Sequence, residues 1–312
     1  MALSKTGPET GSSNARVTVA IASMGRSTLA RTLQSVADQD LPDGVTLEVV
    51  VADDSKDGTA AALIANESFG IPVGTVAVGS GNIATARNAA LERAEGSWIA
   101  FIDDDEWAEP NWIADLLGVA VAYGADAVIG PVEALYPEGT PDWMGRVRLG
   151  QVGIFQKRPG ADGQTLDTGA TSNALVRRSA IGDLRFREEF GRTGGEDTDF
   201  FRRFHKNGGK IVAASRGLVS EHVPSDRLTS THLRRRFGRG GHTFARIELE
   251  GCSVGQRTMF YLQSALKWMV ANALAFAFKP FDPAKSLSYA LRAALNGGKL
   301  RYALGRAAPR LY

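Results

Sequence analysis

The chain has 312 residues, of which 44% are hydrophobic and 22% are charged, as in an ordinary globular protein. Its one cysteine, Cys252, excludes an internal disulfide, so nothing in the composition favours an oxidising compartment. The net charge of +2 conceals an asymmetry: residues 227–312 carry 15 Lys/Arg and three Asp/Glu, whereas the residues before them carry 21 Lys/Arg and 31 Asp/Glu. An acidic body therefore precedes a basic extension.

The predicted elements alternate between strands and helices. Residues 1–15 are rich in Ser, Thr and Gly, without the apolar run of a secretion signal, and we expect a disordered lead-in there. Apolar, β-branched runs predict strands at 16–23, 47–52, 73–78 and 98–102. Helical spacing predicts helices at 27–37, 60–65, 84–94 and 110–123. Short links between them predict an α/β fold with a mostly parallel, doubly wound sheet that binds a nucleotide.

The later part of the chain is less regular. Residues 131–167 contain Gly, Pro and aromatic residues and are predicted to run around the binding site. A further strand is predicted at 171–178 and a helix at 198–206. We therefore expect one nucleotide-binding domain over 16–226 and a basic, helical extension over 227–312.

Two acidic clusters directly follow predicted strands. Asp53-Asp54 ends the second strand and Asp103-Asp104-Asp105 ends the fourth. Ligands of open parallel sheets bind at the carboxyl ends of the strands, so both clusters are expected in one crevice. Neither G-x-G-x-x-G nor G-x-x-x-x-G-K-[ST] is present, which leaves a divalent metal as the obvious partner for a phosphate group.

The acidic triplet has the chemistry of a metal site. Alternate residues of an extended segment point the same way, so Asp103 and Asp105 are predicted to face one hard cation, Mg²⁺ or Mn²⁺. The alternative is a solvated turn in which an aspartate caps the next helix. Repulsion between adjacent carboxylates favours the metal, because a cation offsets it.

Four other side chains are candidate site residues, and each also has an explanation that involves only the fold. Asp54 can bind a ribose or a base, or belong to an Asx-turn. Arg87, on the helix after a Gly-rich loop, can neutralise a phosphate or be solvated. Asp197 follows Gly194-Gly195 and can act as a general base or cap the helix that it opens. His222 ends a short strand and can complete a metal shell or be structural.

The ordered set of segments resembles the family 2 glycosyltransferases, which have the A-type glycosyltransferase fold. The resemblance spans residues 17–203 and is greatest to the succinoglycan-type exopolysaccharide glucosyltransferases, where it extends through EHVPSDRLT and LRRRFGRGG. The segments that carry it are VTVAIASMGRS, VVVADDSKDGT, NIATARNAAL, WIAFIDDDE, TSNALVRRSA and GGEDTDFFRR.

The resemblance implies an inverting, metal-dependent hexosyltransferase with Mn²⁺ or Mg²⁺ as the cofactor. It places the general base at Asp197 and the metal ligands at Asp105, Asp103 and His222. One departure is Ser23-Met24-Gly25, which stands where the family commonly has Thr-Tyr-Asn. The nucleotide-sugar-binding residues that it implies are Ala22, Ser23, Asp54, Arg87, Asp103 and Asp104.

The expected partners follow from the resemblance and the basic extension. UDP-glucose is the first donor that the resemblance implies, and a lipid-linked oligosaccharide in exopolysaccharide or cell-surface glycan synthesis is the acceptor.

Residues 258–278 are apolar, but Lys267 at mid-span argues against a membrane crossing. They are predicted either to lie on a membrane, with 234–236 and Arg239 meeting anionic lipids, or to pack on the body. We expect a cytoplasmic protein, peripheral at the inner face of the cell membrane in the first case, and no nucleic-acid partner.

Two other function classes stay open. A metal-dependent nucleotidyltransferase also uses carboxylates at strand ends, but it releases pyrophosphate rather than a nucleoside diphosphate. A non-catalytic sugar-nucleotide-binding protein is the second, and the presence of Asp197 argues against it.

Overall fold

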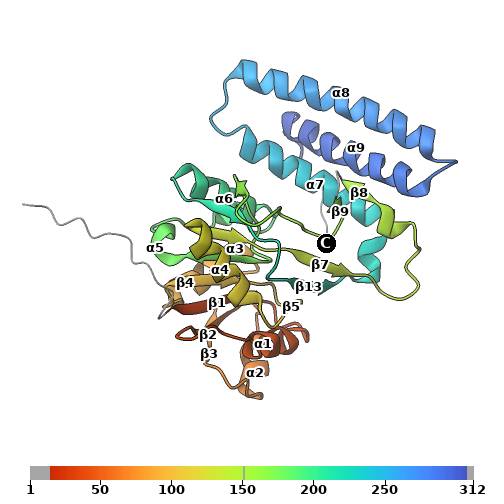
Figure 1. Cartoon of the computed structure of the whole chain (residues 1–312). Coiled ribbons are helices and arrows are strands. Elements are labelled where there is room, and N and C mark those ends of the chain that lie inside the picture. The colour runs from red at the N-terminus through yellow and green to blue at the C-terminus, as the bar shows by residue number, and fades with distance from the viewer. Residues whose placement is uncertain (1–14, 150–151, 308–312) are drawn as a thin grey trace, which may run out of the picture.

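The computed structural model describes residues 15–149 and 152–307, so the expected lead-in lies outside the described residues except for Ala15. Figure 1 shows an α/β body with a layer of three long helices on one side. The helices are α1 (Leu29–Ala37), α2 (Thr59–Ala65), α3 (Ile83–Arg93), α4 (Trp112–Tyr123), α5 (Arg178–Ile181), α6 (Glu196–Lys206), α7 (Ser230–Glu248), α8 (Val254–Phe278) and α9 (Pro283–Ala303). Short 3₁₀ turns lie at Met144–Arg146, Glu188–Phe190 and Ser225–Leu228.

The strands form one large sheet and two small ones. The large sheet has the order β10-β12-β6-β11-β4-β1-β2-β3, and the small sheets are β5-β13-β7 and β8-β9. The strands are β1 (Arg16–Ser23), β2 (Thr46–Asp53), β3 (Val73–Ala77), β4 (Trp98–Phe101), β5 (Glu106–Ala108), β6 (Ala127–Ile129), β7 (Val132–Leu135), β8 (Arg148–Leu149), β9 (Val152–Gly153), β10 (Thr165–Leu166), β11 (Ala174–Arg177), β12 (Ile211–Ala213) and β13 (Val219–His222).

The large sheet is mostly parallel and buried on both faces. Strands β3, β2, β1 and β4 are parallel neighbours, while β11 runs antiparallel between β4 and β6. Apolar side chains of α1, α2 and α4 fill a core on one face, and those of α3 and α6 fill a core on the other. Helices on both faces explain why β1 is a nearly continuous apolar run. The predicted fold class is confirmed, together with each predicted strand and helix to within a few residues at its ends.

The register of the parallel strands positions the candidate residues. Ser23 at the end of β1 lies opposite Asp53 at the end of β2, and β4 ends beside β1, so that its acidic triplet follows at the same edge. A buried side chain, Asn173, joins the elements around this edge. Its amide donates to the carbonyl oxygens of Pro131 and Gly217, both at 2.8 Å, and accepts from the indole of Trp112 at 2.8 Å. The edge is therefore a rigid frame rather than a set of separate loops.

The three C-terminal helices form a second layer. Helix α9 packs against both α7 and α8, and α8 is the outermost of the three in Figure 1. Glycines let α7 and α9 cross closely: a Cβ added at Gly241 would lie 1.8 Å from the Leu295 carbonyl oxygen, and one at Gly298 would lie 1.9 Å from that of Gly238. Leu233 of α7 and Leu287 and Leu291 of α9 anchor the layer in a small core on the body.

The apolar segment at residues 258–278, which was predicted either to lie on a membrane or to pack on the body, falls within α8. This helix packs against α9, which reaches the body through Leu287 and Leu291, and the other face of α8 is exposed. Within the described residues, the combination of length and apolarity needed to cross a bilayer is not met by any helix.

Candidate active site

The carboxyl ends of β1, β2 and β4 open into a cleft of about 610 Å³. The lining also includes Lys157, Glu221, Arg227 and three residues of α7. The cleft brings together most of the predicted nucleotide-sugar and metal residues, which are Ala22, Ser23, Asp54, Arg87, Asp103, Asp104 and Asp105. The sequence-based expectation that the two acidic clusters share one crevice is thus confirmed for these residues.

The first acidic pair divides into two roles. The carboxylate of Asp53 accepts hydrogen bonds from the backbone N–H groups of Ser55 at 3.0 Å and Ala61 at 2.9 Å, which is the Asx-turn alternative. The carboxylate of Asp54 instead accepts from the backbone N–H groups of Gly81 at 3.0 Å and Asn82 at 2.9 Å. Asp54 therefore holds the Gly-rich loop after β3 against the cleft.

The acidic triplet lies in a turn rather than in an extended segment. Asp103 accepts a hydrogen bond from the Arg87 guanidinium at 3.1 Å, whereas Asp104 and Asp105 both accept from Arg26, at 3.0 and 2.7 Å. The extended backbone from which Asp103 and Asp105 were predicted to face one cation is not observed, because the chain turns at Asp104 and Asp105. The Ser23 hydroxyl also donates to Asp104 at 2.6 Å, and burial raises the pKa of that carboxyl.

Arg87 links the triplet to the start of α6. Its side chain is buried, and its guanidinium donates to both Asp103 and Glu196. Burial raises the pKa of the Glu196 carboxyl, and the positive charge of Arg87 opposes that rise. One Glu196 oxygen, Oε2, is buried without a hydrogen-bond partner. Arg87 is thus a buried ion-pair residue and not the solvated helix residue of the alternative reading.

The floor of the cleft contains ionisable residues that sequence reasoning missed. The buried Glu106 carboxylate accepts the backbone N–H of Asp103 at 2.9 Å, and burial beside Asp103 raises its pKa well above the usual range. The Lys157 ammonium donates to the Ser172 hydroxyl at 2.6 Å. Glu106 directly follows the acidic triplet in the sequence, so its position at the same strand end could have been predicted. Lys157 lies in the irregular segment, where nothing local predicted its position.

Helix α7 supplies the basic wall of the cleft. His232, Arg236 and Arg239 are spaced by four and three residues, so they share one helix face, and all three line the cleft. Arg236 and Arg239 were predicted either to meet anionic lipids or to belong to a solvated basic face, and the structure places both in the lining of the cleft. Arg234 and Arg235 of that basic run are exposed. Their helical spacing was visible in the sequence, but the surface that α7 packs against was not.

His222 and Asp197 lie beside the cleft rather than in it. His222 is exposed and packs on the Trp107 ring, with 4.8 Å between ring centroids, at a neighbouring cavity that shares Arg26, Asp105 and Arg227 with the cleft. Asp197 lines a third cavity, between α6 and α7, that meets the cleft at Gly194, Arg236 and Arg239. Successive residues of a helix diverge, so Glu196 faces the cleft while Asp197 does not.

The chemistry of the cleft fits a divalent cation bound together with a diphosphate. Across the described ranges 15–149 and 152–307, no three His, Cys, Asp or Glu side chains are grouped as a metal site. Mg²⁺ and Mn²⁺ nevertheless commonly use one or two carboxylates and complete their shell with phosphate oxygens and water. Asp105 offers hard oxygen donors at the cleft, and the Arg26 guanidinium already pairs with Asp104 and Asp105 there.

The fold matches those of solved glycosyltransferases. The mannosyltransferase PcManGT from Pyrobaculum calidifontis, in complex with GDP-Man and Mn²⁺, aligns with a TM-score of 0.63 at 20% identity, covering 97% of this chain and 92% of that one. Residues 1–349 of S. aureus TarS align with a TM-score of 0.52 at 20% identity, covering 93% and 92%. The architecture is therefore that of an A-type glycosyltransferase with added C-terminal helices.

The sequence places the chain in a particular family. The profile described as Glycosyl transferase family 2 matches residues 18–185, more than half of the chain. The succinoglycan biosynthesis protein ExoM of Rhizobium meliloti (strain 1021) is 35% identical over 294 residues, which cover 93% of each protein. The chain belongs to glycosyltransferase family 2, as the resemblance of its motifs indicated.

The bridge made by Arg87 gives a first prediction. Replacing Arg87 by Met leaves Glu196 buried without its positive partner, and we expect the free energy of unfolding to fall by about 3 kcal/mol. Adding Glu196→Gln should recover much of that loss, since it removes the uncompensated charge. Urea unfolding measures both effects, with Arg216→Met as the control because Arg216 forms an exposed pair with Asp115. Purely additive losses in the double variant would refute the coupling.

Proposed function

We propose that this protein transfers a hexose, with inversion, from a nucleoside diphosphate sugar to a saccharide hydroxyl in exopolysaccharide or cell-surface glycan synthesis. The observation that carries the proposal is the convergence of Asp54, Arg87 and the acidic triplet on one cleft at the ends of parallel strands. The names of relatives support it: structures of TarS are described with UDP and with UDP-GlcNAc, PcManGT with GDP-Man, and ExoM with succinoglycan biosynthesis. UDP-glucose is the donor that we propose first.

The donor is proposed to lie along the acidic side of the cleft. Ala22, Ser23 and Asp54 would border the nucleoside, and Arg87 with Asp103 would border the diphosphate and sugar. Asp105, assisted by Asp103 and by His222 from the neighbouring cavity, would hold Mn²⁺ or Mg²⁺, which stabilises negative charge on a departing diphosphate. Residues 16–226 would thus hold the donor, and α7 of the extension would close over it with basic side chains.

Asp197 is proposed as the general base. Its carboxylate would take the proton of the acceptor hydroxyl while that oxygen bonds to the anomeric carbon. The bond from this carbon to the diphosphate breaks with inversion, and a nucleoside diphosphate leaves. A base on the acceptor side must be apart from the groups that hold the diphosphate, and Asp197 lies outside the donor cleft whereas Glu196 is paired with Arg87.

A product assay tests the reaction class. With UDP-glucose, Mn²⁺ and a saccharide-lipid extract, the protein should release UDP, and chelation of the metal should reduce the rate by at least tenfold. Asp105→Ala should lose this response to metal while keeping its fold. Release of pyrophosphate would indicate a nucleotidyltransferase, binding without product would indicate a non-catalytic protein, and full activity in chelator would refute the metal.

The base assignment gives a separate prediction. Asp197→Asn keeps the shape but removes the proton acceptor, so turnover should fall by roughly 10²–10⁴-fold with donor affinity near that of the wild type. Steady-state kinetics and titration with UDP-glucose measure the two quantities. If Asp197→Asn has a normal rate and Glu196→Gln is inactive, Glu196 and not Asp197 is the base. If both variants are active, the base is another residue.

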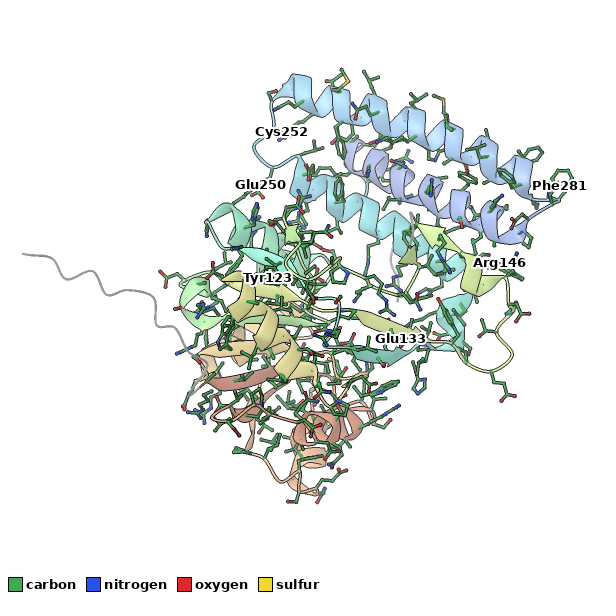
Figure 2. All side chains as sticks on the ribbon, in the orientation of Figure 1. Tyr123, Glu133, Arg146, Glu250, Cys252 and Phe281 are labelled. Atoms are coloured by element: carbon green, nitrogen blue, oxygen red, sulfur yellow. The ribbon has the colours of Figure 1, made fainter. Side chains whose placement is uncertain are left out.

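We also propose that the protein acts as a peripheral protein on an anionic membrane surface, bound through α8. One face of this helix carries five apolar side chains that are each 55–80% exposed: Met259, Leu262, Leu266, Met269 and Phe276. Their spacings of three, four, three and seven residues are those of one helix face, so they form a single stripe along a helix of about 37 Å. Cys252 and Phe281 mark the two ends of α8 in Figure 2, and Phe281 is 84% exposed.

The charges around this stripe favour an anionic partner. Residues 254–307 contain eight Lys/Arg and one acidic residue, Asp282, and α8 itself contains no acid. Lys267 of α8 and Arg292 of α9 line one apolar hollow beside the stripe. A second copy packed face to face would oppose these basic residues without acids to offset them, whereas anionic lipid attracts them.

Vesicle sedimentation tests the stripe. The wild type should bind vesicles of mixed phosphatidylglycerol and phosphatidylcholine at low salt, more weakly at high salt because screening reduces the attraction. The variant Leu262→Ser with Leu266→Ser should bind at least tenfold more weakly, since both side chains lose apolar insertion. Val121→Ser, an equally exposed apolar site on α4, is the control. If the wild type is instead a dimer and the double variant is a monomer, the partner of the stripe is a second copy of the chain and not a membrane.

A further inference from the structure

The third cavity, between α6 and α7, has no role in donor binding. It measures about 590 Å³, within the range of pockets that hold small molecules. Its walls come from the first turn of α6, from one face of α7 and from Leu295 and Lys299 of α9. It joins the donor cleft at Gly194, Arg236 and Arg239, which border both spaces.

We propose that this cavity is the binding site for the acceptor saccharide. Two aromatic rings, Phe237 and Phe244, are spaced by seven residues on α7 and line it. Aromatic faces bind the apolar faces of sugar rings, and Phe237 offers such a surface, whereas the cations of Arg202 and Lys299 already lie over the Phe244 ring. The guanidinium and ammonium groups of Arg236, Arg239 and Lys299 carry N–H donors that suit sugar hydroxyls. Such a mixture of apolar surface and a few directed donors is typical of a site that binds and orients a small polar ligand.

The start of α6 is held rigidly between the two spaces. Gly194 and Gly195 have positive φ angles of 78° and 95°, and a Cβ at Gly195 would lie 2.1 Å from the Thr243 side chain of α7. The Thr243 hydroxyl also donates to the Gly194 carbonyl oxygen at 3.3 Å. This contact fixes the first residues of α6, so that Glu196 lines the donor cleft and Asp197 lines the third cavity.

The peptide unit between Glu196 and Asp197 therefore separates the two spaces of the proposed site. The donor and its diphosphate lie on the Arg87 and Glu196 side, and the acceptor hydroxyl enters from the Asp197 side through the opening at Gly194. This inference rests on the proposed function, in which Asp197 is the base. It assigns the acceptor to a space that the basic C-terminal helices complete, so α7 and α9 determine which saccharide is accepted.

A cavity-filling variant tests the assignment. Gly240 lines the cavity on α7, and a Cβ there meets no atom within 4 Å, so Gly240→Phe can place a ring in the cavity without a clash at the Cβ. We expect the saccharide-stimulated release of UDP from UDP-glucose to fall at least tenfold, with the dissociation constant of UDP-glucose changed less than twofold. Gly118→Phe is the matched control, because Gly118 also faces open space but lies on α4 outside these cavities.

A second variant separates binding from catalysis. Lys299→Met removes a donor at the far wall, so it should raise the KM for the saccharide-lipid extract severalfold while kcat and the KM for UDP-glucose stay near the wild-type values. Unchanged stimulation by saccharide in Gly240→Phe, with donor binding intact, would overturn the acceptor assignment. A wild type that binds no sugar nucleotide, or whose UDP release no saccharide stimulates, would overturn the proposed function instead.

Discussion

The site depends on offsetting negative charge that the sheet brings together. Parallel strands end at one edge, so Asp54, the triplet and Glu106 are forced into the same small volume as Glu196. Two arginines offset this charge: Arg87 bridges Asp103 and Glu196, and Arg26 bridges Asp104 and Asp105. Without these cations the carboxylates would repel one another and take up protons, because burial already raises the pKa of several of them.

The uneven charge of the chain is visible at the cleft. Carboxylates of the acidic body line one side, and basic side chains of α7 line the other. Close glycine contacts between α7 and α9, and the small core at Leu233, Leu287 and Leu291, fix that helix over the site. A layer that looked like an addition to the α/β body is therefore part of the cleft wall, and α8 keeps an exposed apolar face.

Two neighbouring residues show how a helix start separates functions. Glu196 and Asp197 have the same charge and adjacent positions, yet one is buried against Arg87 and the other lines a different cavity. The turn of the helix backbone directs them apart, and the tight contact of Gly195 with Thr243 fixes that orientation. The direction of the helix backbone, rather than a difference in residue chemistry, thus decides which of the two cavities each carboxylate lines.

The sequence by itself determined the elements whose signals are local. Buried β-branched runs predicted β1, β2 and β4, and the acids that follow them could be assigned to one edge because parallel strands share their direction. It did not reveal that the triplet turns toward Arg26, that Lys157 reaches the cleft, or that Arg236 and Arg239 line the cleft. These features arise from contacts between segments far apart in the chain. Only tertiary packing decides which face of a helix meets a distant strand end, because that depends on how every intervening segment folds.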